Sequence, residues 1–313
     1  MTDSFASLFS VAVILDIAIG DPKNFFHPVR LIGTLINFLS SRLCTGPHDF
    51  SRGLVLCVMT LSVTGLSVWG VLYLTGYNSL VQIYLLYSAI AWRDLKDETA
   101  VILHALMRNN IDDARKYLSF VVGRDTGNLC ESEIISATIE TISENSIDGV
   151  ISVMFYAFIG SLINASCLLV WLFKASSTLD SMIGYEKFQE FGKCAARLDD
   201  ALNFIPARLG GVIIACCNVQ ALRVFFHDRL NHKSPNSAHG ESAFAGALDI
   251  KLGGGAFYDG RFVARPVINS HGKDCGLYDI VRAWRLLDRS CALFAVIILI
   301  TVLILRNYTL LLT

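Results

Sequence analysis

Charged residues are scarce in this chain: they make up 17% of its 313 residues, whereas hydrophobic residues make up 53%. With a mean hydropathy of +0.52, this composition excludes an ordinary soluble domain and indicates an integral membrane protein. A net charge of −1 gives no electrostatic reason to expect nucleic acid as a partner. The start, Met1-Thr2-Asp3, carries an acid in place of a basic leader, so we expect no cleaved signal peptide.

Signatures of common metal and nucleotide sites are also missing. The nine cysteines are scattered without a Cys-x-x-Cys pair, which argues against a zinc site or a disulfide framework. The histidines of residues 227–241 do not have the His-Glu-x-x-His spacing of zinc proteases, and the glycines of residues 123–127 do not form a P-loop. No internal repeat or low-complexity linker interrupts the chain, so residues 1–313 are predicted to form a single domain.

Long apolar runs predict an all-α, multi-pass membrane protein with about four to six membrane helices and helical or loop segments in the cytoplasm. The predicted spans are residues 5–20, 54–74, 80–92, 150–173 and 291–305, with 209–226 as either a marginal span or an interfacial helix. The run 150–173 is the strongest candidate, because a straight helix of that length reaches about 36 Å. Asp16 lies within the first run and is expected to face protein.

The distribution of Lys and Arg places residues 93–149 and 227–290 in the cytoplasm. Strict alternation of the spans would then place residues 174–203 outside, unless that segment re-enters the membrane. The sequence leaves both possibilities open.

An acidic stretch ends against the run that starts at Val150. If the segment from Ser132 is helical, Glu140, Glu144 and Asp148 recur every four residues and share an arc of roughly 80° on one face. Stacked carboxylates repel one another, so a cation is expected to compensate them. Mg²⁺ is suitable, because one or two carboxylates with waters and substrate phosphates commonly hold it. The alternative interpretation is an acidic helix face in contact with water.

Two loops combine glycines with groups that bind anions. The loop Gly123-Arg124-Asp125-Thr126-Gly127 offers backbone N–H groups and a guanidinium to a phosphate. Residues 227–241 contain three histidines and two acids, and the run Gly253-Gly254-Gly255 follows them. Asn231, Ser234 and Asn236 in this segment suit hydrogen bonds to a phosphate or an amide-rich ligand better than they suit a transition metal.

Several multi-residue blocks, in one order along nearly the whole chain, resemble the CobD/CbiB family of cobalamin biosynthesis proteins. The blocks are Leu15-Asp16 with Gly20-Asp21-Pro22 and His27-Pro28-Val29-Arg30, Val122-Gly123-Arg124-Asp125-Thr126, Glu140-Thr141 with Glu144-Asn145 and Asp148-Gly149, Thr178-Leu179-Asp180-Ser181-Met182 with Gly184-Tyr185, Arg197-Leu198-Asp199-Asp200 with Pro206-Ala207-Arg208, and Asn231-His232 with Ser234-Pro235-Asn236. No block is missing, and the departures are small residues exchanged within blocks.

The resemblance implies a multi-pass inner-membrane ligase with its active site on the cytoplasmic face. Its expected reaction joins the free propionate carboxylate of adenosylcobyric acid to an amino alcohol, commonly (R)-1-aminopropan-2-ol phosphate, to give adenosylcobinamide phosphate. ATP and Mg²⁺ are expected as cosubstrate and metal, with an acyl phosphate as the activated carboxyl group. Expected partners are these substrates, the lipid bilayer and other membrane enzymes of the corrinoid pathway.

Under this resemblance, each part of the reaction receives candidate residues. The Mg²⁺ ligands are predicted to be Glu140, Glu144 and Asp148, helped by Asp125 or Asp180. Phosphates of ATP or of the amino alcohol are assigned to Arg124, Lys174 and Arg208, and further ligand contacts to Asn231, Ser234 and Asn236. The catalytic set is Glu144 and Asp148 together with a proton acceptor for the ammonium group, which is Asp199, Asp200, Glu241 or His232. Corrinoid contacts are expected from Tyr185, Asn203, Asn236 and Tyr258.

The sequence leaves two other function classes open. A transporter would use polar residues within apolar runs, such as Asn164, Asn218 and Gln220, to line its path. A non-catalytic regulator or assembly component would need no reactive site. Some of the acids and arginines also have a purely structural interpretation, because charges near a bilayer pair to avoid isolation, as Asp199 would with Arg197 or Arg208.

Overall fold

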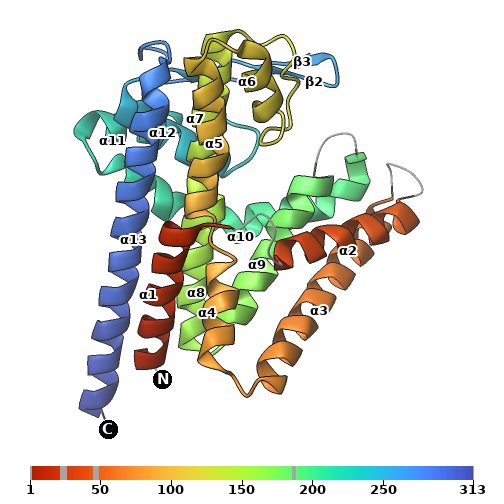
Figure 1. The fold of residues 1–313 in the computed structure, drawn as a ribbon, viewed down its shortest axis with the longest axis vertical. Helices are drawn as coiled ribbons and strands as arrows, with labels where there is room; N and C mark the ends of the chain where they lie inside the picture. The colour runs from red at the N-terminus through yellow and green to blue at the C-terminus, as the bar shows by residue number, and fades with distance from the viewer. Residues whose placement is uncertain (1, 22–26, 45–48, 185–187, 313) are drawn as a thin grey trace. The chain divides into compact units, whose positions relative to one another are not determined.

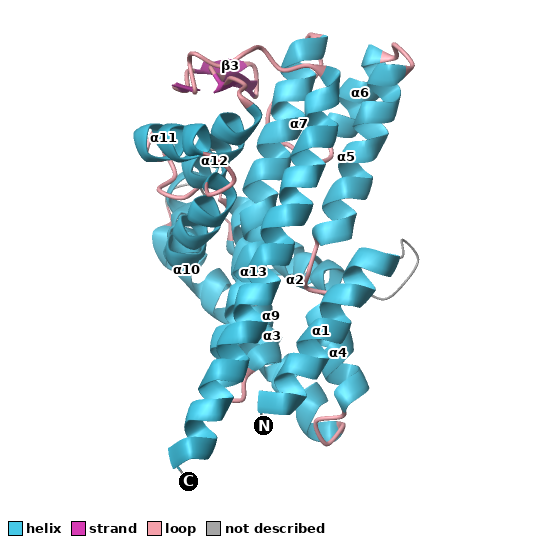
Figure 2. Cartoon of the chain, turned by 90° about the vertical axis from the view of Figure 1, so that its left-hand side faces the viewer, coloured by secondary structure: helices cyan, strands magenta, loops and turns pink. Residues whose placement is uncertain are grey.

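A computed structural model describes residues 2–21, 27–44, 49–184 and 188–312, and it is built almost entirely of helices (Figure 1; Figure 2). The first half contains α1 (Thr2–Ile19), α2 (Pro28–Leu43), α3 (Phe50–Leu74), α4 (Ser79–Tyr87), α5 (Trp92–Met107), α6 (Ile111–Leu118), α7 (Glu131–Asn145) and the π-helix η1 (Ser146–Ile151). The second half contains α8 (Ser152–Leu162), α9 (Ser166–Ile183), α10 (Gln189–Ala215), α11 (Val219–Asp228), α12 (Ser237–Leu248), β1 (Leu252–Gly253), β2 (Ala256–Tyr258), β3 (Arg261–Val263), β4 (Val267–Ile268) and α13 (Leu277–Leu312).

Three helical stretches are long and apolar enough to cross a membrane. They are Phe50–Leu74, Glu131–Leu162 and Leu277–Asn307, and Phe5–Ile19 is a shorter apolar helix. These stretches include the predicted spans 54–74 and 291–305. The prediction of an all-α, multi-pass membrane protein is therefore confirmed.

The prediction of one span over residues 150–173 is wrong, because α8 ends at Leu162 and α9 begins at Ser166. Asn164 adopts the left-handed conformation with φ 57°, and the backbone N–H of Ala165 donates to the carbonyl oxygen of Gly160 over 2.7 Å. Asn tolerates this conformation better than most residues, so it ends the helix without a proline.

Two other predicted runs are shorter or interrupted in the structure. The run 80–92 is helical only to Tyr87. The run 209–226 is divided between α10, which ends at Ala215, and α11, whose start is capped by Asn218. The Asn218 side chain accepts a hydrogen bond from the backbone N–H of Ala221 over 2.7 Å. Residues 209–226 are therefore not one continuous span.

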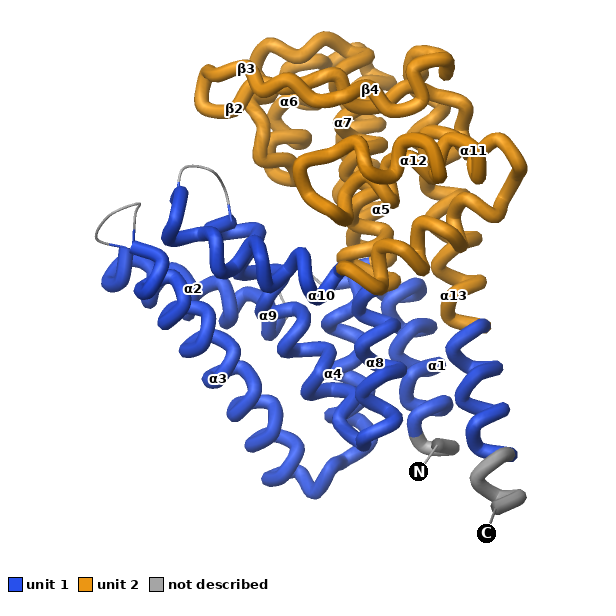
Figure 3. The backbone as a smooth tube through the Cα atoms, turned by 180° about the vertical axis from the view of Figure 1, so that it is seen from behind, with its two compact units in different colours: residues 1–91, 152–203, 297–313 blue, residues 92–151, 204–296 orange. Residues whose placement is uncertain are grey.

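Unit 1 is the first of two compact units and comprises residues 1–91, 152–203 and 297–313 (Figure 3). Within it, α9 packs against α2, α3, α4 and α8, and α1 packs against α4. The Trp171 indole N–H donates to the carbonyl oxygen of Leu85 over 2.9 Å and fastens α9 to α4. Asp16 is fully buried, which confirms that it faces protein.

Unit 2 comprises residues 92–151 and 204–296 (Figure 3). Within it, α7 contacts α5, α6, α12 and β1, and α11 lies along α12. Two antiparallel ribbons, β1 with β4 and β2 with β3, follow α12. At Gly240, α12 approaches α7 closely, because a Cβ atom there would lie 2.7 Å from the carbonyl oxygen of Ser143 in α7. The packing of α7 with α12 positions the candidate site.

Some sequence predictions are not tested by this fold. Pro22 and Tyr185, which belong to the motif blocks, lie outside the described residues. The single domain predicted for residues 1–313 and the sidedness of the loops stay predictions.

Candidate functional site

The predicted acidic face is formed in part by α7. Glu140 and Glu144 lie one helical turn apart within this helix; Glu140 is buried and Glu144 is exposed. The α-helix ends at Asn145, and Asp148 belongs to the π-helix η1. A π-helix has a wider turn than an α-helix, so the register assumed for a continuous α-helix does not apply to Asp148, and its place on the acidic face stays a prediction. Its role as a metal ligand stays a prediction.

The carboxylate of Glu140 joins three segments of unit 2. It forms an ion pair with Arg124 from the predicted glycine-flanked loop. Its Oε1 atom accepts hydrogen bonds from the backbone N–H of Gly253 over 3.0 Å and from the Ser136 hydroxyl over 3.2 Å. Burial lowers the pKa of Arg124, but Glu140, with smaller contributions from Tyr258 and Glu241, more than offsets this, so the pKa is raised and the guanidinium stays charged.

Asp125, the next residue of the same loop, joins it to the β2–β3 ribbon. Its Oδ2 atom accepts a hydrogen bond from the backbone N–H of Gly260 over 2.8 Å, and its own N–H donates to the carbonyl oxygen of Phe257 over 2.8 Å. Tyr258, a predicted corrinoid contact on this ribbon, accepts a hydrogen bond from Arg265 at its hydroxyl. The loop and the ribbon therefore support one another beside Glu140.

Glu241 contributes a second buried acid, from α12. Burial is the main cause that raises its pKa well above the usual range of a carboxyl group, and the charges of Glu140 and Glu144 raise it further. Arg265 and Arg124 oppose the shift without cancelling it. The folded protein therefore keeps Glu241 in its neutral form to higher pH than the unfolded chain does. In that state the group is a hydrogen-bond donor, and it accepts a proton only after losing its own.

A cationic cluster is formed by Arg208 of α10 and Arg229, which follows α11. The Nη1 atom of Arg208 donates to Oδ1 of Asn236 over 3.3 Å, and the guanidinium lies 3.4 Å from the ring centroid of Phe204. The Nε atom of Arg229 is buried without a hydrogen-bond partner among the described residues. Burial and the charge of Arg229 lower the pKa of Arg208. A bound anion would relieve the repulsion of the two guanidinium groups.

His239 lies beside these arginines and is fully buried. Burial lowers its pKa to about 4, with the charges of Arg208 and Arg229 as further causes. The imidazole is therefore neutral at neutral pH. Neither ring nitrogen has a hydrogen-bond partner among the described residues. This arrangement presents an uncharged polar ring next to two cations.

The first turn of α12 connects the acidic and the cationic groups. The Ser237 hydroxyl donates to Oε1 of Glu144 over 3.0 Å. The preceding residue, Asn236, accepts the hydrogen bond from Arg208. The structure thus brings together Glu144, Arg208 and Asn236, which were predicted separately from the sequence. A carboxylate suited to a metal and a guanidinium suited to a phosphate meet at the same helix end.

The other predicted residues of this segment form a turn that leads into α12. The backbone N–H of Ser234 donates to Nδ1 of His232 over 3.0 Å, and the backbone N–H of Asn236 donates to the Ser234 hydroxyl over 3.2 Å. Asn231 donates from its side-chain amide to Oδ1 of Asp228 over 2.9 Å. These contacts fix the backbone before the helix.

The remaining predicted site residues belong to unit 1. Lys174 and Asp180 lie on α9, and Asp199 and Asp200 lie on α10. Asp199 accepts a hydrogen bond from Asn203 over 3.0 Å. The other amide atom of Asn203 accepts one from the Ser152 hydroxyl over 2.7 Å. The catalytic and binding roles of these residues stay predictions.

Sequence reasoning missed Arg229, His239 and Arg265 as site residues. The first two lie within the polar segment 227–241, whose composition indicated a binding loop but did not rank its members. Among the described residues, no three His, Cys, Asp or Glu side chains converge closely enough to hold a metal ion by themselves. A Mg²⁺ ion bound through substrate phosphates needs only one or two protein carboxylates.

A family model described as the CobD/Cbib protein matches residues 9–287 of this chain. The chain belongs to the CobD/CbiB family. No solved structure matches it.

Curated CobD/CbiB proteins are similar to this family member over most of their length. The cobalamin biosynthesis protein CobD of Clostridium tetani is 39% identical over 312 residues, which cover 93% of this chain and 96% of the relative. The cobalamin biosynthesis protein CbiB of Salmonella typhimurium is 37% identical, covering 88% and 91%. CobD of Pelobacter propionicus is 40% identical, covering 85% and 87%. The candidate site described above falls within the region matched by the family model.

Proposed function

We propose that this protein is an ATP-dependent amide ligase of cobalamin biosynthesis. Its reaction would join the free propionate carboxylate of adenosylcobyric acid to (R)-1-aminopropan-2-ol phosphate or a related amino alcohol. Membership of the CobD/CbiB family supports the pathway. The observation that best supports the chemistry is the meeting of Glu144, Ser237, Asn236 and Arg208 at the first turn of α12.

The proposed reaction proceeds in two steps that balance. The carboxylate oxygen attacks the γ-phosphorus of ATP, an acyl phosphate forms and ADP leaves. The neutral amine of the second substrate then attacks the acyl carbon, and the amide forms as phosphate leaves and a proton is lost. In phosphoryl transfer, most of the catalysis comes from positioning and from neutralising charge.

The residues of unit 2 fit these requirements unequally. Glu144 is exposed, and the Ser237 hydroxyl orients its carboxylate, so it is a proposed Mg²⁺ ligand that an ion can reach from solvent. Glu140 is already paired with Arg124, and a metal would have to compete with that guanidinium. Bound Mg²⁺ would neutralise charge on the phosphates. Arg208 and Arg229 are the proposed phosphate contacts.

The proposal also uses two ionisable groups, Glu241 and His239, whose shifted pKa values favour their neutral forms. The raised pKa of Glu241 favours its neutral form, and His239 is uncharged, so both features limit the charge beside the arginines and carboxylates. The proton acceptor for the ammonium group is proposed among His232, Glu241, Asp199 and Asp200. We place the active site on the cytoplasmic face of the inner membrane, because ATP is supplied there.

The decisive experiment measures product formation by purified protein in detergent or proteoliposomes. The protein would be incubated with adenosylcobyric acid, ATP, Mg²⁺ and aminopropanol phosphate, with each component omitted in turn, and the corrinoids analysed by mass spectrometry. We expect a product heavier by the amino alcohol phosphate minus one water, formed only when ATP is present. Failure of folded protein to couple any candidate amine would contradict the ligase and favour a transport or assembly role.

A further inference from the structure

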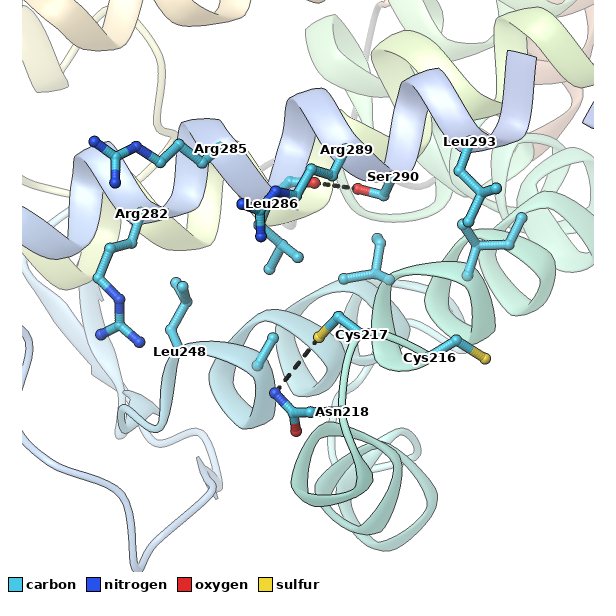
Figure 4. Close-up of a pocket in the computed structure, with 13 residues that line it drawn as sticks. Cys216, Cys217, Asn218, Leu248, Arg282, Arg285, Leu286, Arg289, Ser290 and Leu293 are labelled. Atoms are coloured by element: carbon cyan, nitrogen blue, oxygen red, sulfur yellow. Dashed lines mark hydrogen bonds between the residues drawn. The ribbon is translucent and has the colours of Figure 1, made fainter. Parts of the chain in front are cut away.

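A cavity in unit 2 is lined by none of the site residues described above. Its volume is about 550 Å³, and it lies where the end of α10 and the start of α11 meet the last turn of α12 and the first half of α13 (Figure 4). Its lining residues are Ile213, Ile214, Cys216, Cys217, Asn218, Ala247, Leu248, Arg282, Arg285, Leu286, Arg289, Ser290 and Leu293. This volume is within the range of small-molecule sites.

Three arginines of α13 line one side of this cavity. Arg282, Arg285 and Arg289 are separated by three and four residues, so they lie on one face of the helix (Figure 4). Arg282 is paired with Asp279 over 2.7 Å, and Arg285 donates to the Tyr278 hydroxyl over 3.0 Å.

The positive charge of this face is only partly neutralised by the protein, because within the described part of the chain Asp279 pairs with Arg282 alone. Arg289 has no carboxylate partner among the described residues, and none of the described lining residues is acidic. The cavity therefore has an excess of positive charge and suits an anion.

The opposite end of the cavity is apolar and open. Leu293 lines it and is 47% exposed, and Val296, one turn further along α13, is 50% exposed. Both residues belong to the stretch Leu277–Asn307, which is long and apolar enough to cross a membrane. Val219, next to the lining residue Asn218, is 65% exposed. The helix thus presents cationic groups first and a lipid-like surface next.

We propose that this cavity binds the headgroup of an anionic phospholipid. The phosphodiester would contact Arg285 and Arg289, and an acyl chain would lie along Leu293 and Val296. Arginines at the end of a membrane helix commonly bind anionic headgroups in this way. A free phosphate matches only the cationic half of the surface and leaves the apolar half exposed. The proposal depends on the membrane location of the protein and is independent of the ligase reaction.

The test uses the full chain purified in a neutral detergent. Dihexanoylphosphatidylglycerol, dihexanoylphosphatidylcholine and inorganic phosphate would be titrated separately, and the apparent unfolding temperature measured at each concentration. We expect the anionic lipid alone to raise this temperature. Replacing Arg285 and Arg289 by Gln should weaken its apparent affinity by about fivefold for each arginine removed. Arg108→Gln, at an exposed arginine outside the cavity, is the matched control.

Several outcomes would overturn the proposal. Equal stabilisation by phosphatidylcholine would show that the headgroup charge is not recognised, and equal stabilisation by inorganic phosphate would indicate a free-anion site. Displacement of the lipid by a corrinoid would assign the cavity to substrate. If the double variant does not fold, the exposed single variant Arg289→Gln replaces it, and unchanged affinity in that variant would equally contradict the proposal.

Discussion

Arg124 and Glu140 form a buried ion pair that joins the loop before α7 to α7 itself, with only 13% and 5% of their side chains exposed. A buried carboxylate needs such a partner, because an isolated charge away from water is strongly unfavourable. The pair also sets the position of β1, since the backbone N–H of Gly253 donates to the same carboxylate. Arg124 therefore has a structural role in addition to any contact with phosphate.

Removing one partner of this pair is expected to be far more damaging than removing both. Arg124→Gln leaves Glu140 buried and unpaired, and it should destabilise the protein by about 3 kcal/mol. The double variant with Glu140→Gln should recover much of that loss, because two neutral amides replace the two charges. Thermal unfolding of the four proteins of the cycle measures the coupling. Additive losses would contradict a direct ion pair.

Glu144→Gln should abolish turnover while the protein stays folded in the membrane. The substitution keeps the shape of the side chain and its hydrogen bond with Ser237, but it removes the charge that would bind Mg²⁺. We expect a loss of at least about a hundredfold in kcat, the scale of removing a group that stabilises transition-state charge. Glu131→Gln, an exposed acid on the same helix, is the control and should be fully active. An active Glu144→Gln enzyme would refute the metal assignment.

Local sequence patterns predicted the individual helices and loops of the site better than they predicted the contacts between them. The four-residue spacing of Glu140 and Glu144 correctly indicated one helix, because that spacing follows from helical geometry alone. The change to a π-helix at Ser146 has no comparable local signal, so the sequence did not predict the helix type that carries Asp148. The contact of Gly253 with Glu140 joins residues 113 positions apart, and it depends on packing that no local pattern specifies.

The break between α8 and α9 shows a similar limit. Hydropathy alone favours one helix over residues 150–173, because the three residues Ile163, Asn164 and Ala165 barely change the average. The available signal was Asn164, a residue type that accepts the left-handed conformation found there at φ 57°. Whether such an Asn ends a helix depends on the chain that follows it. At Gly160, a Cβ atom would lie 2.5 Å from the Cα atom of Ser166, so the turn needs that glycine.

The raised pKa of Glu241 predicts a dependence of stability on pH. The folded protein binds a proton at Glu241 that the unfolded chain releases above its ordinary pKa of 4.5, so stability falls as pH rises from that value towards the raised pKa of the folded state. Glu241→Gln removes this proton linkage. The difference in unfolding free energy between this variant and the wild type should therefore grow in favour of the variant, by up to about 1.4 kcal/mol for each pH unit above pH 5.

Thermal unfolding of both proteins at a series of pH values between 5 and 8 measures this difference. Glu131→Gln removes an exposed carboxyl group from α7 and should follow the wild type throughout. A difference between Glu241→Gln and the wild type that does not grow with pH would show that Glu241 is ionised in the folded protein.

His239 should report the binding of an anion between Arg208 and Arg229. Its pKa of about 4 is lowered partly by those two charges, so a bound phosphate group should raise it. Histidine NMR signals, assigned with the variant His239→Asn, would be titrated with and without a non-hydrolysable ATP analogue. An unchanged pKa of His239 at saturating analogue would place the nucleotide elsewhere.

The same histidine affects stability in acid. Between pH 4 and 6.5 the unfolded chain binds a proton at His239 that the folded protein excludes, so the stability of the wild type falls as pH decreases through this range. His239→Asn should lose less stability over that interval, and thermal unfolding at pH 5 and pH 7 measures the difference. Parallel losses in the two proteins would show that His239 does not contribute.

Gly240→Ala should separate α12 from α7 and disturb the site without removing a polar group. The added Cβ atom would lie 2.7 Å from the carbonyl oxygen of Ser143, a distance at which one helix must move. We expect a destabilisation of about 1–3 kcal/mol, typical of overpacking in a well-packed interior. Because Ser237 is on the first turn of α12, the shift should also weaken its hydrogen bond to Glu144 and raise the Mg²⁺ concentration needed for half-maximal activity.

Gly70→Ala is the matched control for this substitution, because Gly70 is also within a helix and nothing lies within 4 Å of a Cβ atom at that position. It should retain the stability and the Mg²⁺ dependence of the wild type. The decisive comparison is between the two effects of Gly240→Ala. A loss of stability with an unchanged Mg²⁺ requirement would mean that the contact between Ser237 and Glu144 does not position the metal. Unchanged stability would contradict the close approach of the two helices, on which the whole arrangement of Glu144, Asn236 and Arg208 depends.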